Sequence, residues 1–191
     1  MNFDFKGVVF DGGNFGGAEF SGGTVEFDFA QFSGGTVWFD GAQFSGGKVY
    51  FSNVQFCGSK VFFGGAQFSG GKVFFNVAQF SGGTVHFSGA EFSGSMVEFR
   101  GVEFSGGTVN FGGVKFPQGG VFGGAQFSGG TVRFVGADFS GSTVRFGGAE
   151  FSGGELDFSR AGDWSHPPEF PWTDTPPSGV KLPRKEDHAQ A

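Results

Sequence analysis

Residue types that support catalysis or staple small domains are scarce in this chain of 191 residues. It has one cysteine, Cys57, and three histidines, so an internal disulfide is excluded and neither a metal site nor a cofactor site is expected. No apolar run reaches eighteen residues, because a glycine, a serine or a charged residue interrupts each one, and a membrane-spanning helix is therefore excluded. The lone cysteine fits a reducing compartment.

The N-terminal residues 1–6 have neither a basic leader nor an apolar stretch, so no signal peptide is expected and we predict a cytoplasmic protein without a membrane partner. The net charge of −6 is unevenly spread. Residues 1–47 carry six acidic residues against one lysine, whereas residues 48–90 carry three lysines and no acidic residue. Because no basic face is evident, direct binding of nucleic acid is not expected.

What the chain has in abundance is phenylalanine, with 32 residues, and glycine, with 40. From Phe20 to Phe158, phenylalanine returns at alternating intervals of five and seven residues, which predicts a solenoid. Each half-unit has the form apolar-x-Phe, as at residues 30–32 and 37–39, so an extended segment sends both apolar side chains inward and the middle one outward. Short bends such as 40–41 alternate with longer bends such as 33–36, and both are rich in residues that accept positive φ.

Short strands alternate with two-residue bends, and alanine or valine stands two places before a central phenylalanine. This pattern resembles the pentapeptide-repeat family over about residues 5–161. The pattern stands out at residues 8–12, 42–46 and 90–94, with phenylalanine in place of the family's more usual leucine. The resemblance implies an all-β fold, a right-handed four-sided parallel β-helix, for the solenoid domain 1–161. Residues 162–191 are predicted to form a C-terminal cap and a disordered tail, with Trp164, Phe170 and Trp172 over the last coil and disorder from Lys181 onward.

Two coil sizes fit the alternating spacing. We favour a four-sided coil of about 24 residues, because the short bend turns about a right angle in the family that this chain resembles. In addition, the long bend can be lost without losing the pattern: phenylalanine follows at a plain spacing of five from Phe5 to Phe20. A coil of twelve residues would instead stack Lys48, Lys60 and Lys72 into one ladder, and this alternative stays open at this point.

Some outward positions carry aromatic residues and lysines where equivalent positions hold charged or polar residues such as Glu26 and Glu98. Exposed aromatic residues beside cations are typical of a protein-binding surface. A purely structural interpretation is that aromatic residues suit exposed strands. On a coil of 24 residues the set would divide between opposite faces. The candidate partner-binding residues are Trp38, Lys48, Tyr50, Lys60, Phe62, Lys72 and Phe74.

No residue pattern indicates catalysis. The Ser-Gly-Gly-Thr bend recurs along the chain, unlike a phosphate-binding loop, and His86 has no acidic residue in its own unit. We therefore predict a non-enzymatic β-solenoid that acts as a scaffold or protein–protein interaction module for an unidentified protein partner.

The resemblance adds two expectations. Members of the family often dimerise through a solenoid end, which predicts a homodimer here. Some members are DNA mimics that bind DNA gyrase or topoisomerase and protect it from quinolone-type drugs, which is the alternative function. Residues 1–161 carry thirteen acidic against nine basic residues, and so small a surplus disfavours a mimic of duplex DNA.

Overall fold

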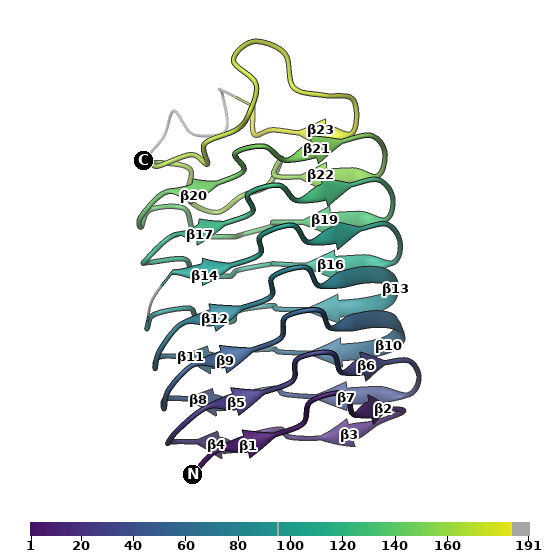
Figure 1. Ribbon diagram of the computed structural model, residues 1–191. Coiled ribbons are helices and arrows are strands. Elements are labelled where there is room, and N and C mark those ends of the chain that lie inside the picture. The colour runs from purple at the N-terminus through teal and green to yellow at the C-terminus, as the bar shows by residue number, and fades with distance from the viewer. Residues whose placement is uncertain (95, 185–191) are drawn as a thin grey trace.

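The computed structural model describes residues 1–94 and 96–184, which form one stack of β-coils (Figure 1). This part of the chain has 23 strands and no helix, and all strand pairs are parallel. Val25 lies beside Val49, and Val49 beside Val73, so the chain returns above itself after 24 residues. The structure confirms the predicted fold class, a four-sided parallel β-solenoid of about seven coils, and rules out the coil of twelve residues.

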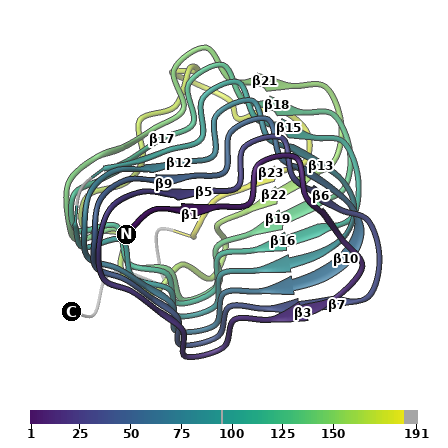
Figure 2. The ribbon, with the colours of Figure 1, turned by 60° about the horizontal axis from the view of Figure 1, so that its bottom comes forward.

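Each coil has four sides, which Figure 2 shows obliquely from one end. Side 1 is a seven-stranded sheet that begins at the N-terminus. In five of its strands an inward valine precedes an outward residue, as the apolar-x-Phe pattern predicts. The strands of side 1 are β1 (Phe3–Asp4), β5 (Val25–Glu26), β9 (Val49–Tyr50), β12 (Val73–Phe74), β14 (Val97–Glu98), β17 (Gly120–Val121) and β20 (Val144–Arg145).

Sides 2 and 3 belong to one larger sheet, because two long strands continue through the bend between them. Those two strands are β10 (Gln55–Phe62) and β13 (Gln79–His86). The other strands of side 2 are β2 (Val9–Phe10), β6 (Gln31–Phe32), β15 (Glu103–Phe104), β18 (Gln126–Phe127) and β21 (Glu150–Phe151). The other strands of side 3 are β3 (Gly13–Asn14), β7 (Thr36–Trp38), β16 (Thr108–Asn110), β19 (Thr131–Arg133), β22 (Glu155–Asp157) and β23 (Val180–Lys181).

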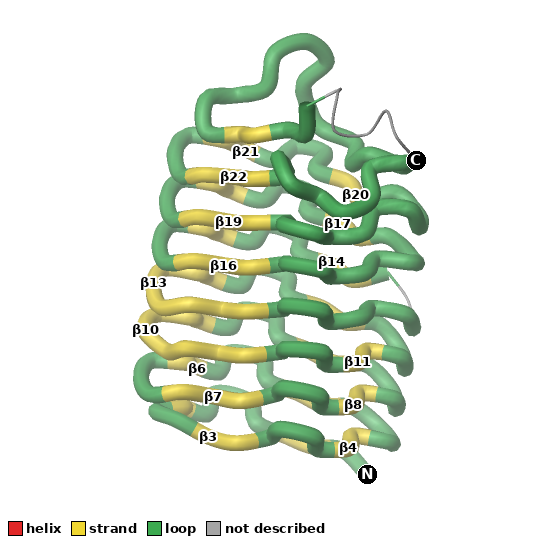
Figure 3. Tube along the Cα trace, turned by 180° about the vertical axis from the view of Figure 1, so that it is seen from behind, coloured by secondary structure: helices red, strands yellow, loops and turns green. Residues whose placement is uncertain are grey.

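Side 4 is the least regular, and Figure 3 shows it beside side 3 from behind. Its sheet has only three strands, and beyond them single bridges continue the column from Gln67 through Glu91 and Lys115 to Asp138. The strands of side 4 are β4 (Glu19–Phe20), β8 (Gln43–Phe44) and β11 (Gln67–Phe68). In the described part of the chain, no helix has the length and apolarity needed to cross a membrane.

The core consists of four columns of phenylalanine rings, one behind each side. Within a column the rings are parallel: those of Phe27 and Phe51 have centroids 4.7 Å apart and an interplanar angle of 1°. That separation equals the ~4.7–4.9 Å spacing of strands and exceeds the contact distance of carbon atoms, so the rings stack with an offset. Rings from the opposite sides 1 and 3 meet edge to face in the middle of the coil, as Phe51 and Phe63 do at 5.6 Å and 88°. Stacked aromatic rings therefore set the interior of every coil.

Stacking also explains the glycines of the long bends. Each bend lies directly on the bend of the coil below, with backbone against backbone. A Cβ atom on Gly70 would lie 2.2 Å from the carbonyl oxygen of Gly46, a distance that side chains do not tolerate. The close approach of successive coils thus excludes a side chain at bend positions such as Gly70.

The C-terminal aromatic residues lie on the last coils. Phe170 stacks over Phe146 with centroids 5.4 Å apart, Trp172 stacks on Phe170 at 4.4 Å, and Trp164 packs edge-on against Phe139. Strand β23 adds to side 3, and Lys181 Nζ donates to Glu155 Oε2 at 2.8 Å. Lys181, placed in the disordered tail by the sequence, is thus part of a strand, and residues 185–191 of that tail lie outside the described residues.

Candidate partner-binding surfaces

The seven residues predicted to bind a partner lie on two opposite sides of the solenoid. Each side carries its aromatic residues in one outward column and its lysines in the column two residues earlier along the strand. The side 1 ladder consists of Lys48, Tyr50, Lys72 and Phe74. The side 3 ladder consists of Trp38, Lys60 and Phe62, and the structure adds His86 to it.

On side 3, three rings form one outward stack. The centroids of Trp38 and Phe62 are 4.5 Å apart with an interplanar angle of 13°, and those of Phe62 and His86 are 5.1 Å apart with an angle of 2°. Trp38 is 41% exposed. Because the rings cover one another's faces, the stack presents mainly ring edges to solvent. Burial lowers the pKa of His86 below its usual 6.5, although Asp40 opposes this effect.

On side 1, Tyr50 and Phe74 stack with centroids 5.0 Å apart and an interplanar angle of 10°. Glu26 continues the column below this pair and Glu98 continues it above. Lys48 makes no ion pair with any residue in the described ranges. The side 1 ladder is therefore an aromatic pair between two carboxylates, with an unpaired cation alongside.

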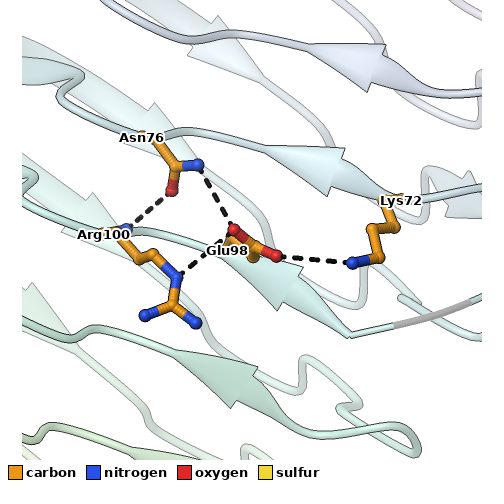
Figure 4. Close-up of polar contacts among 4 residues, drawn as sticks. All are labelled: Lys72, Asn76, Glu98 and Arg100. Carbon is orange, nitrogen blue, oxygen red and sulfur yellow. Dashed lines mark hydrogen bonds and ion pairs between the residues drawn. The ribbon is translucent and has the colours of Figure 1, made fainter.

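A polar cluster closes the upper end of the side 1 ladder (Figure 4). Glu98 Oε2 accepts hydrogen bonds from Arg100 Nε and Asn76 Nδ2, both at 3.3 Å, and Glu98 Oε1 lies 3.8 Å from Lys72 Nζ. Asn76 Oδ1 accepts from the backbone nitrogen of Arg100 at 2.9 Å. The carboxylate of Glu98 is thus held by its neighbours, and Lys72 lies at the edge of this cluster.

A second polar group closes the lower end. Lys6 and Glu26 form an ion pair there. Asp28 Oδ1 accepts from the backbone nitrogen of Ser52 in the next coil at 2.8 Å. Burial raises the pKa of Asp28, and the bond from Ser52 partly offsets this effect.

Two residues that the sequence did not single out lie beside the side 1 ladder, at the short corner between sides 1 and 2. Phe29 and Val77 are 62% and 52% exposed. Their φ angles are 62° and 59°, in the left-handed region, and Asn53 in the coil between them has a φ of 57°. The sequence could have indicated these two residues by their position in the repeat, since other coils have a glycine at this corner: Gly7, Gly101, Gly124 and Gly148.

Comparison with known families bears on this geometry. A family model described as pentapeptide repeats in nine copies matches residues 5–55. Residues 5–55 thus match the pentapeptide-repeat family. The described structure extends the same stacked phenylalanine columns well beyond the matched residues, to Phe158. No curated protein matches the chain. Pentapeptide-repeat solenoids are generally non-catalytic.

A small cavity of about 120 Å³ lies on side 4. Its lining includes Phe116, Pro117 and Lys115. The interval from Phe116 to Phe122 is six residues instead of seven. The ring centroid of Phe116 lies 5.8 Å from that of Phe92 and 6.0 Å from that of Phe139, farther apart than other stacked rings of the core. The cavity thus marks a local irregularity of the coil. Among the described residues, no group of three or more histidine, cysteine or acidic side chains is arranged to hold a metal ion.

Proposed function

We propose that this protein is a non-catalytic scaffold that binds a protein partner through its outward aromatic ladders. The observation that supports the proposal is where the aromatic residues lie. Trp38, Tyr50, Phe62 and Phe74 occupy outward columns in neighbouring coils, and farther along the same columns the chain carries residues such as Glu98 and Arg133. The core does not need them, because every coil already has its inward rings.

Exposed aromatic residues also stabilise neighbouring strands, and this explanation makes a different prediction. If the ladders only stabilise the coil, their replacement lowers stability and changes no interaction. If they bind a partner, replacement of one ladder abolishes an interaction while the folded protein persists. The two explanations are therefore separable by experiment.

The test is affinity capture from lysate of the source cells with three forms of the protein: wild type, Tyr50→Ser with Phe74→Ser, and Trp38→Ser with Phe62→Ser. Thermal unfolding followed by circular dichroism checks that each variant is folded. We expect a protein that wild type captures and that one ladder variant loses, and we expect the purified partner to bind wild type directly. Identical captured proteins from all three forms would contradict the proposal.

Interaction with DNA gyrase or topoisomerase as a DNA mimic is the alternative, and the surface charge supports it less. A DNA mimic needs a dense line of negative charge, since duplex DNA carries one charge per ~1.7 Å of axis. On side 4, Lys115 lies between Glu91 and Asp138. On side 1, Arg100 and Lys72 lie beside Glu98. Capture of gyrase or topoisomerase subunits in the same experiment would favour the alternative.

A homodimer through the N-terminal end and a cytoplasmic location are also part of the proposal. The dimer is supported by apolar exposure in the first coil, where Met1, Val8 and Val9 are exposed. Phe5 and Phe15 are only partly buried there. Sedimentation at micromolar concentration tests the dimer, and Val9→Asp is expected to shift the protein to monomer. A reducing location is supported by the exposed free thiol of Cys57.

A further inference from the structure

Three consecutive coils place side chains where the short corner normally uses glycine. At the opposite short corner, between sides 3 and 4, glycine fills the equivalent slot in six coils, with φ between 61° and 70°. Those glycines are Gly17, Gly41, Gly65, Gly89, Gly113 and Gly136.

The left-handed conformation is unfavourable for residues with a Cβ atom, most of all for β-branched valine. Asparagine tolerates it well, but Phe29 and Val77 do not. Packing does not demand these side chains, because a Cβ atom on Gly7 or Gly124, in the same slot of other coils, would meet no atom within 4 Å. Phe29 and Val77 also remain mostly in solvent. Strain that brings no burial points to a function of these two side chains.

These corner residues adjoin the side 1 ladder. Val77 follows Phe74 by three residues, and Phe29 lies in the coil directly below Tyr50. Backbone hydrogen bonds stack the corner residues in order: Phe29 N donates to Ser52 O at 3.0 Å. The corner patch, defined as Phe29, Tyr50, Phe74 and Val77, therefore covers three coils, or roughly 10 Å along the axis at ~4.8 Å per coil.

The charged side chains around the corner patch differ in whether they have partners. At its ends, Glu26 is paired with Lys6, Asp28 accepts a hydrogen bond from the backbone nitrogen of Ser52, and Glu98 is bonded by Arg100. Along its flank on side 1 lies Lys48, which is unpaired among the described residues. Along its flank on side 2 lie uncharged side chains: Gln31, Gln55 and Gln79. The charge left without a partner beside the apolar atoms is thus positive.

We propose that the corner patch binds a short amphipathic segment of a partner protein, with apolar side chains on Phe29, Tyr50, Phe74 and Val77 and acidic side chains opposite Lys48. An apolar centre with a polar rim is the usual anatomy of a protein interface. The inference rests on the proposed function and specifies which surface and which partner chemistry serve it. It also accounts for the two strained side chains, which the ladders alone do not explain.

The experiment selects peptides from a displayed library of random 15-residue sequences on immobilised wild-type protein. The Kd of one enriched synthetic peptide is then measured by fluorescence anisotropy. The test variants are Phe29→Gly with Val77→Gly, which restores the residue used in other coils, and Lys48→Glu. The matched control is Asn110→Ser with Arg133→Ser, two outward residues of side 3 that lie outside the ladders.

We expect enriched peptides that combine apolar and acidic residues. Each test variant should weaken binding at least tenfold, and the control should leave it unchanged. The glycine variant should keep the melting temperature of wild type, since its new residues fit the left-handed corner. Failure to enrich any peptide, enrichment of basic or uncharged peptides, or undiminished binding to the glycine variant would overturn the inference.

The lysate experiment separates this inference from the proposed function. A captured partner that binds the glycine variant as tightly as wild type, but is lost with Trp38→Ser and Phe62→Ser, supports the scaffold function and overturns the corner patch. Identical captured proteins from wild type and every variant overturn both.

Discussion

Replacement of Phe87 by alanine tests the stacked core directly. Phe87 is fully buried, and its ring lies between those of Phe63 and Phe111, with centroids 4.8 Å and 5.0 Å away. The ring also meets Phe75 edge to face at 5.4 Å. Loss of a core phenylalanine costs ~3–5 kcal/mol. Because inter-strand hydrogen bonds hold both stacked neighbours in register, the cavity cannot collapse, and we expect a loss of ~4–5 kcal/mol, near the top of this range.

The control is Phe15→Ala in the first coil. Phe15 is partly buried and stacks on one face only, against Phe39 at 4.9 Å. Because Phe15 has one stacked neighbour instead of two and is already partly exposed, we predict a loss of ~2 kcal/mol. Urea unfolding followed by circular dichroism measures both, with coincident probes to check two-state behaviour. Equal losses at the two positions, or a loss at Phe87 below about 2 kcal/mol, would refute the reasoning.

Three further predictions concern the bends, the titration and the corner. Gly70→Ala should destabilise the fold by more than ~2 kcal/mol, because its Cβ atom meets the backbone of the coil below. Gly65→Ala has open space around it and should cost only the ~1–2 kcal/mol of a non-glycine residue in the left-handed conformation. Thermal melts compare the two variants. His86 has a lowered pKa in the fold, so the unfolded chain binds the proton more tightly and stability falls as pH drops below about 6.5; His86→Asn should remove this part of the pH dependence in urea titrations at pH 5 and 7. Phe29→Gly with Val77→Gly should change the unfolding free energy by less than ~1 kcal/mol, since relief of strain offsets lost contacts; a larger loss would show that these side chains hold the fold.

The coil was predictable from the sequence because its determinants are local. The inward residues follow a period of two within each short strand, and the bends carry glycine where the backbone needs it. The coil size followed from Phe5 to Phe20, whose plain spacing showed that the long bends are optional. The structure agrees: the first coil takes 22 residues from Phe10 to Phe32 instead of 24.

The candidate surface was only partly predictable. Aromatic residues in outward slots could be recognised, but their division between sides 1 and 3 depends on the coil size. Phe29 escaped notice because, in a chain with 32 phenylalanines, one more at a bend resembles the repeat itself. Its φ of 62° is a property of the folded corner, and so is that of Val77. Their exposure beside Tyr50 also becomes visible only once successive coils are stacked.

The most direct test of the central claim is a titration of the purified partner, once captured, into wild type and the two ladder variants by calorimetry. The account predicts that at least one of the two ladder variants binds the partner at least tenfold more weakly than wild type. Equal binding by all three proteins would contradict the claim that this solenoid recognises its partner through outward aromatic residues.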